Sequence, residues 1–230
     1  MPLTAPSEVD PLQILVYADS LSWGIVPGTR RRLPFPVRWP GRLELGLNAD
    51  GGAPVRIIED CLNGRRTVWD DPFKPGRNGL QGLAQRIEIH SPVALVVLML
   101  GNNDFQSMHP HNAWHAAQGV GALVHAIRTA PIEPGMPTPP ILVVVPPPIR
   151  TPCGPLAPKF ASGEHKWAGL PGALRELCAT VDCSLFDAGT VIQSSAVDGV
   201  HLDADAHVAL GDALQPVVRA LLAESSGHPS

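Results

Sequence analysis

Four polar segments, far apart in the sequence, contain residue types that together could carry out acyl transfer. They are Ala18–Leu21, Asn63–Arg65, Gly101–Asp104 and Asp198–His201. Acyl transfer through a covalent intermediate needs a serine nucleophile, a histidine base with a carboxylate behind it, and donors that stabilise an oxyanion. The four segments contain all of these parts. They therefore indicate a serine hydrolase site, provided that the fold brings them together.

The expected nucleophile is Ser20, with His201 as its base and Asp198 behind the imidazole. A serine hydroxyl is a poor nucleophile until a base removes its proton, and histidine titrates close to the working pH. The spacing of three residues lets Asp198 and His201 meet on one turn, where the carboxylate can fix the ring tautomer. Each signal is weak alone, because Ser20 could be a helix N-cap and Asp198 could cap a surface turn. The surroundings of Ser20 do not match the G-x-S-x-G elbow.

The expected oxyanion donors are the side-chain amide of Asn103 and the backbone N–H groups of Ser20 and Gly64. Each such donor contributes on the order of 2.7–4 kcal/mol to catalysis, and glycine lets the backbone approach a substrate closely. The alternative is that Asn103 and Gly64 are ordinary turn residues, since N-G and G-N-N-D are common turn sequences.

Short aliphatic runs predict the strands that would position these residues. They are Gln13–Tyr17, Val55–Ile58, Ala94–Leu100, Ile141–Val145 and Ser184–Phe186. The third and fourth runs are apolar throughout, as parallel strands buried on both faces require. Helical patterns alternate with the strands at 39–47, 112–129, 170–181 and 205–222. Pro216 is expected to kink or split the last helix.

Alternating strands and helices predict a doubly wound, flavodoxin-like α/β fold with a five-stranded parallel sheet and helices on both faces. Ligands of such folds bind beyond the carboxyl ends of the strands. Each of the four polar segments follows a predicted strand. All four should therefore project from the same edge of the sheet, and this convergence is the strongest argument that the sequence offers.

Composition narrows the class of protein. The chain has 230 residues, 44% of them hydrophobic, and a formal net charge of -4, which argues against nucleic-acid binding. No apolar run approaches the ~20 residues that a membrane helix needs, and the N-terminal residues do not resemble a signal peptide. The four cysteines form no CxxC pair. Free thiols in a reducing cytoplasm are therefore the expected state.

Proline is abundant, with 26 residues against an average of about 5%. Many lie in long segments, including 27–40, 72–82 and 146–158, which also contain aromatic and aliphatic residues. We expect ordered loops there that wall a pocket or form a subunit interface. The basic run Arg30–Arg32 is interpreted as a solvated or interface segment.

The four segments resemble the conserved blocks of the SGNH hydrolases, also called the GDSL esterase/lipase family, in order and over nearly the whole chain. The bacterial arylesterase/acyltransferase subgroup is the more similar one. Its features are found at 19–24 (Asp-Ser-Leu-Ser-Trp-Gly), Arg38–Gly41, Leu62–Arg65, Met99–Gly101, Pro146–Pro148, Phe186–Gly189 and Val197–His201. This resemblance implies the triad and the oxyanion donors named above, and subunits that assemble around their active sites.

Two positions depart from the family pattern. Ala18 stands where the family has glycine, and Asn102 replaces the usual threonine before Asn103. Asn102 is expected to place an amide in the pocket, which bears on substrate preference and not on the chemistry.

Four further residues are candidate substrate-binding groups: Asp19, Trp23, Asn63 and Asn102. For Asp19, a structural hydrogen-bonding role beneath the site is favoured over a catalytic one, and Trp23 could be a core residue. His109, His111 and His115 raise the question of a metal. Supporting carboxylates and cysteines are missing near them, so no metal site is expected.

The sequence thus predicts a serine esterase that hydrolyses short-chain acyl esters through an acyl-enzyme, without cofactor, with release to water or to another alcohol. We expect one domain over 1–230 with mobile ends at 1–11 and 224–230. We also expect a cytoplasmic homo-oligomer that binds small ester molecules and neither nucleic acid nor membrane. A carbohydrate O-deacetylase of the same mechanism and a catalytically silent binding protein are the alternatives.

Overall fold

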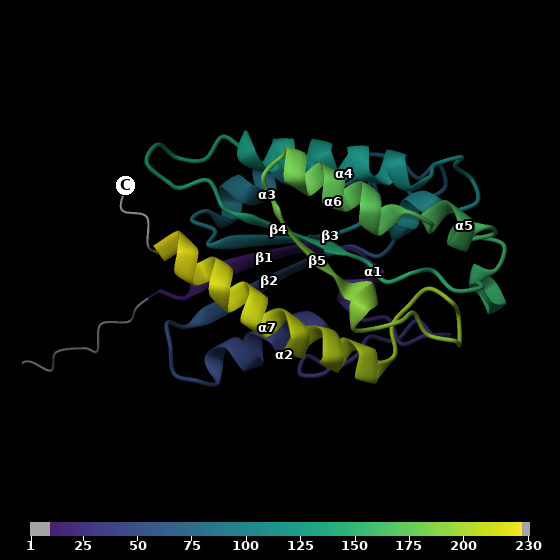
Figure 1. Ribbon diagram of the computed structural model, residues 1–230, viewed down its shortest axis with the longest axis horizontal. Coiled ribbons are helices and arrows are strands. Elements are labelled where there is room, and N and C mark those ends of the chain that lie inside the picture. Colours follow the sequence, from purple (N-terminus) through teal and green to yellow (C-terminus); the bar gives the residue numbers. More distant parts are fainter. Residues whose placement is uncertain (1–9, 227–230) are drawn as a thin grey trace, which may run out of the picture.

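A computed structural model describes residues 10–226, which form a parallel sheet with helices on both faces (Figure 1). Its strands are β1 (Leu12–Ala18), β2 (Val55–Cys61), β3 (Leu95–Met99), β4 (Ile141–Val145) and β5 (Ser184–Asp187). The order across the sheet is β2-β1-β3-β4-β5, and every neighbouring pair is parallel. The predicted five-stranded, doubly wound α/β fold is confirmed. The order reverses between β1 and β3, and a crevice for ligands opens at such a point.

The helices are α1 (Ser20–Trp23), α2 (Trp39–Asn48), α3 (Leu83–His90), α4 (Ala113–Arg128), α5 (Gly163–Trp167), α6 (Leu170–Thr180) and α7 (Ala204–Ser226). Figure 1 places α4 and α6 on one face of the sheet and α2 and α7 on the other. Successive residues of a strand point to opposite faces, so each face has its own core. Leu15 of β1 packs in the core under α4 and α6, whereas its neighbour Ile14 packs in the core under α2 and α7.

Two helices, α3 and α5, were not predicted from the sequence, and the one-turn helix α1 was expected after Ser20 only as a turn into a helix without bounds; each has eight residues or fewer. Three short 3₁₀ turns, at Asn102–Phe105, Gly154–Leu156 and Ala188–Thr190, were also not predicted. Short helices give little periodic signal, because four or five residues cover little more than one turn. The two that matter most for the site, α1 and the 3₁₀ turn at Asn102–Phe105, follow directly after β1 and β3.

Pro216 does not split α7, which continues from Ala204 to Ser226. Of the two outcomes expected for Pro216, a kink or a split, the split is therefore wrong. Pro216 is exposed, whereas Leu210, Leu214 and Val218 are fully buried. Proline removes one backbone hydrogen bond, and on this solvent-facing side water can satisfy the freed carbonyl. The apolar face of α7, which packs on the sheet, therefore continues past Pro216 without interruption.

Most of the ends that were expected to be mobile, 1–11 and 224–230, lies outside the described residues. Of these ends, residues 224–226 continue α7. No helix within residues 10–226 is long and apolar enough to cross a membrane.

Close packing of α4 on the segment after β2 leads to a stability prediction. A Cβ atom added at Gly119 would lie 2.1 Å from Oγ1 of Thr67 and 2.6 Å from its Cβ. Thr67 is β-branched and fully buried, so it has little freedom to move away. Gly119→Ala should therefore lower the free energy of unfolding by ~1–3 kcal/mol, as overpacking does. Urea unfolding measures this change.

Gly172 of α6 is the matched control, because an added Cβ there meets no atom within 4 Å. Gly172→Ala should raise the free energy of unfolding by ~0.5–1 kcal/mol through helix propensity alone. Equal effects of the two substitutions would contradict the packing argument.

Candidate active site

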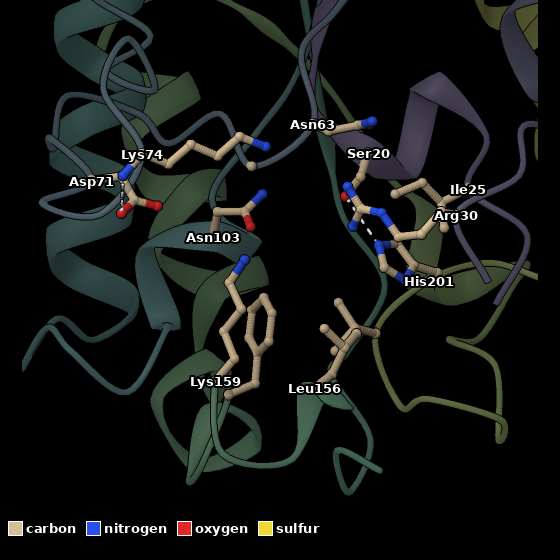
Figure 2. A pocket seen from close by; sticks show the side chains of 13 residues that line it. Ser20, Ile25, Arg30, Asn63, Asp71, Lys74, Asn103, Leu156, Lys159 and His201 are labelled. Atoms are coloured by element: carbon tan, nitrogen blue, oxygen red, sulfur yellow. Dashed lines mark hydrogen bonds between the residues drawn. The ribbon is translucent and has the colours of Figure 1, made fainter. Parts of the chain in front are cut away.

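Ser20, His201 and Asp198 lie in one hydrogen-bonded row, as the sequence predicts, and Figure 2 shows its contact between Ser20 and His201. Nε2 of His201 is 3.2 Å from Oγ of Ser20, and its Nδ1 is 2.8 Å from Oδ2 of Asp198. An ionised carboxylate can only accept hydrogen bonds, so Nδ1 carries the proton that faces Asp198. Nε2 is then free to accept the serine proton. The row can activate a hydroxyl for attack on a carbonyl carbon.

The surroundings of Asp198 keep its carboxylate ionised. Its Oδ1 accepts hydrogen bonds from the backbone N–H groups of Val200 (3.0 Å) and His201 (2.9 Å). Oδ2 accepts one from the N–H of Gly28, at 3.3 Å. Burial is the largest influence on the pKa of Asp198 and raises it, but the hydrogen bond and charge of His201 and the backbone donors together lower it to about 2. Asp198 is therefore a fixed negative charge behind the imidazole at neutral pH.

Asp19 places Ser20 at the first position of α1, directly after β1. Its Oδ1 accepts a hydrogen bond from the N–H of Leu21 at 2.9 Å and so caps the helix. Gly24, in the left-handed conformation at φ 86°, ends the helix after one turn. The first N–H groups of a helix have no partner within it. The N–H of Ser20 is among these groups, so it is available to a ligand beside its own hydroxyl.

The amide of Asn103 is held from both ends. Its Nδ2 donates to Oδ2 of Asp19 at 2.7 Å, and its Oδ1 accepts from Nε2 of Gln106 at 2.8 Å. The Gln106 amide is oriented in turn by Arg66, whose Nη2 donates to Oε1 of Gln106 at 2.7 Å. An amide nitrogen has two hydrogens, and only one is used by Asp19. The second can be donated into the pocket, which Asn103 lines.

Gly64 lies at the carboxyl end of β2 with φ 83°, a conformation that favours glycine. The neighbouring Arg65 ties this end of β2 to β1. Its Nη1 donates to the carbonyl of Ala18 at 2.9 Å, and its Nη2 contacts Oδ1 of Asp60 at 2.6 Å. Ala18, which stands where the resembled family has glycine, is buried within β1, and its methyl group is packed in the core. Gly64 and Ser20 are thus fixed side by side at the strand ends.

Asp104 anchors the 3₁₀ turn that carries Asn103. Its Oδ1 accepts from the N–H of Thr67 at 3.0 Å, and its Oδ2 accepts from the Thr67 hydroxyl at 2.5 Å. Both Asp104 and Asp19 are almost fully buried. Burial raises the pKa of Asp104 to about 7 and that of Asp19 to about 6, although their hydrogen bonds lower both.

Ser20, His201 and Asn103 face a small pocket of about 60 Å³. Of the residues predicted from sequence, the pocket is lined by Ser20, Asn63, Gly64, Asn103 and His201. The three proline-rich segments 27–40, 72–82 and 146–158 contribute Arg30, Lys74 and Leu156, respectively. The expectation that these loops wall a pocket is confirmed.

Three predicted substrate-binding residues do not line this pocket. Asp19 is buried beneath it with both oxygens engaged, so it positions its neighbours and does not contact a substrate. Asn102 is only 1% exposed, and neither atom of its amide has a hydrogen-bond partner. Trp23 is half-buried, with the guanidinium of Arg32 over its ring at 4.9 Å. Burial of Asp19 and Asn102 corrects the expectation of substrate contact for these two residues, whereas contact by Trp23 stays a prediction.

Gln106 and Arg66 are site residues that the sequence analysis missed. Both are fully buried and reach the site only through Asn103. The one available signal is their position next to predicted motifs, Gln106 after Gly101–Asp104 and Arg66 after Asn63–Arg65.

His109, His111 and His115 form a stack. The ring centroids of His109 and His111 lie 4.7 Å apart, and Trp69 packs on His111 at 4.0 Å. Burial lowers the pKa of His111 to about 4, so this ring is neutral near pH 7. Within residues 10–226, no group of three or more His, Cys, Asp or Glu side chains is arranged to hold a metal ion. The stack serves packing between the segments after β2 and β3.

Comparisons with known proteins agree with this geometry. The model of the GDSL-like lipase/acylhydrolase family matches residues 19–213. Among solved structures, the chain is similar to an inhibitor-bound aryl esterase from M. smegmatis, with 34% identity and a TM-score of 0.86 over 91% of this chain and 99% of that one. No protein with a curated description matches the chain.

Two further solved structures are similar over the same shares of the chains, 91% of this one and 99% of the other. Est24, a carbohydrate acetylesterase from Sinorhizobium meliloti, has 33% identity and a TM-score of 0.85. A putative arylesterase from Agrobacterium tumefaciens str. C58 has 36% identity and a TM-score of 0.82.

The raised pKa of Asp104 leads to a prediction about stability and pH. The folded protein keeps a proton on Asp104 up to about pH 7, whereas the unfolded chain releases it near the usual value of 3.8. The stabilisation from this protonated carboxyl is complete below pH 3.8 and is lost as the pH rises through 7. Asp104→Asn cannot ionise. The melting temperature of the wild type minus that of the variant should therefore fall between pH 5 and 7 and then level off.

Asp205→Asn is the control, because Asp205 is exposed at the start of α7. Its melting-temperature difference from the wild type should not change over the same range. A difference for Asp104→Asn that stays constant from pH 5 to 8 would contradict a raised pKa.

Proposed function

The chain belongs to the GDSL-like lipase/acylhydrolase family and is an esterase, and we propose that it hydrolyses short-chain acyl esters through an acyl-enzyme on Ser20. The observation that carries this proposal is the hydrogen-bonded row from Ser20 through His201 to Asp198, at a pocket that Asn103 and Gly64 also line. The nucleophile, the base and the orienting carboxylate are thus in contact. The oxyanion donors face the same pocket.

In the first half of the proposed reaction, Nε2 of His201 takes the proton of the Ser20 hydroxyl as Oγ attacks the ester carbonyl. The carbonyl oxygen becomes an oxyanion that accepts hydrogen bonds from the N–H groups of Ser20 and Gly64 and from the Asn103 amide. Asp198 stabilises the imidazolium that forms. When the tetrahedral intermediate collapses, His201 returns the proton to the leaving alcohol, and the acyl group remains on Ser20.

In the second half, water attacks the acyl-enzyme while His201 acts as base, and the carboxylic acid is released. An alcohol in place of water would give a new ester by the same steps. The small pocket supports short acyl groups, since its apolar lining comes from Ile25, Leu156, Phe160 and Val200 and encloses little space. The balance between hydrolysis and transfer depends on how well the pocket mouth excludes water.

Carbohydrate O-deacetylation is a second candidate, favoured by the similarity to Est24. It uses the same residues and differs only in the alcohol that leaves. Acetylated sugars tested beside aryl acetates would separate the two activities. The homo-oligomer and the cytoplasmic location stay predictions.

Substitution of Ser20 tests its role as the nucleophile. Ser20→Ala should lower kcat for an aryl acetate by ~10⁴–10⁶, because no acyl-enzyme can form. Initial rates with para-nitrophenyl acetate measure the loss, and an unchanged melting curve shows that the fold is kept. Ser107→Ala, at an exposed position outside the pocket, should keep full activity. Retention of most activity by Ser20→Ala would refute the assignment.

Substitution of Asn103 tests its role as an oxyanion donor. Asn103→Ala should lower kcat by ~10²–10³ with a smaller change in KM, because this hydrogen bond strengthens in the transition state. Asn63→Ala is the comparison, since Asn63 lines the same pocket but is not proposed as a donor. Its effect should fall mainly on KM. If the effect of Asn103→Ala were confined to KM, Asn103 would be a substrate-binding residue instead.

A further inference from the structure

Three cationic side chains line the catalytic pocket: Arg30, Lys74 and Lys159. They come from three different loops, so their convergence is a property of the fold and not of one basic segment. In Figure 2, Lys74 and Lys159 reach into the opening on the side of Asn103, and Arg30 lies on the side of Ser20 and His201. The cations thus surround the space in which an ester would bind.

None of the three side chains has an ion-pair partner among the described residues. Several cations elsewhere in the described part of the chain do have partners. Arg38 contacts Glu59 at 2.6 Å and Arg42 contacts Asp212 at 2.6 Å. Lys166, near the pocket, donates to the carbonyl oxygens of Gln106 and His109. With residues 10–226, the ammonium groups of Lys74 and Lys159 form no hydrogen bond of this kind.

Asp71 is the one acidic side chain among the lining residues, and its charge is already used. Its Oδ2 pairs with Nη2 of Arg66 at 3.1 Å. Its Oδ1 accepts from the N–H groups of Phe73 (2.9 Å) and Lys74 (3.1 Å). The pocket therefore has a surplus of positive charge.

The cations also affect one another. Burial lowers the pKa of Lys159, Asp71 opposes this, and the charges of Lys74 and Arg30 lower it further. Arg30 and Lys74 are exposed and Lys159 is half-buried, and their like charges repel one another across the pocket. A bound anion would remove this repulsion and would gain charge-assisted hydrogen bonds.

We propose that the natural substrate is an ester that carries an anionic group, a carboxylate or a phosphate, held at the pocket mouth by Lys74, Lys159 and Arg30. This inference rests on the proposed function of the same pocket. The anion can belong to the acyl part or to the alcohol part of the ester. His201 protonates the leaving oxygen, so an anion on the alcohol would lie toward Arg30, and one on the acyl group toward the two lysines.

Two pairs of esters of similar shape test the proposal. Monomethyl succinate against methyl butanoate carries the charge on the acyl side, and para-acetoxybenzoate against para-acetoxybenzamide carries it on the alcohol side. For each pair the measured quantity is kcat/KM of the anionic ester divided by that of the neutral one. We expect this ratio to favour the anion in at least one pair at low ionic strength. It should fall as salt screens the cations.

Substitutions assign the effect to residues. The double substitution Lys74→Met and Lys159→Met should lower the ratio for the acyl-side pair, if the anion binds there. If the anion binds on the alcohol side, Arg30→Gln should lower the ratio for the alcohol-side pair. The expected decrease is about tenfold for each cation that binds the anion. Arg31→Gln is the matched control, because Arg31 is adjacent, exposed and absent from the pocket lining. It should leave both ratios unchanged.

The outcomes separate the two claims. Hydrolysis of the neutral esters with ratios near one in the wild type, or ratios that none of the three pocket substitutions changes, would overturn the anionic substrate and leave the esterase function standing. Absence of hydrolysis with all four esters, or hydrolysis that persists in Ser20→Ala, would overturn the proposed function itself. A ratio that favours the anion, falls with salt and drops only in the pocket variants would establish the inference.

Discussion

The hydrogen bond between Asp19 and Asn103 joins the carboxyl ends of β1 and β3, and the geometry of the site depends on it. One oxygen of Asp19 caps the helix that begins with Ser20, and the other holds the Asn103 amide. A single buried side chain therefore sets both the position of the nucleophile and the direction of a donor opposite to it. This contact is possible because β1 and β3 are neighbours in the sheet, so that no other strand lies between their ends.

The hydrogen-bond network beneath the site consists of buried polar groups, whose desolvation costs free energy. They lie next to the residues whose orientation catalysis depends on. Gln106 donates to the Asn103 amide, Arg66 donates to Gln106, and both side chains are fully buried. A buried polar network is rigid when every member is satisfied and destabilising when one is lost. Burial raises the pKa of Asp19 to about 6 in spite of its hydrogen bonds. Burial of the Asp19 carboxyl group therefore costs free energy, and the same carboxyl group orients the Asn103 amide.

Sequence reasoning found the parts of the site whose signal is local. Continuous apolar runs indicate β3 and β4 because both faces of these strands are buried, and Ser20, Asp198 and His201 are recognisable by residue type and place. It failed where a role depends on contacts between distant segments. Nothing near Gln106 indicates that Arg66, 40 residues earlier, will orient it. The pocket-facing role expected for Asn102 was wrong for the same kind of reason, since the turn after β3 directs that amide into the interior.

The basic run at 30–32 illustrates how the fold divides residues of one type. Arg32 pairs with Glu59 at 2.8 Å and donates to the carbonyl of Trp23, Arg31 is exposed, and Arg30 lines the catalytic pocket. The sequence alone does not distinguish the three arginines. Their surroundings differ because of the path that the loop takes past β2 and the site. Only Arg32 gains a protein partner that stabilises the folded chain. The charge of Arg30, like those of Lys74 and Lys159, has no ion-pair partner within residues 10–226, so it is available to an anion that enters the pocket.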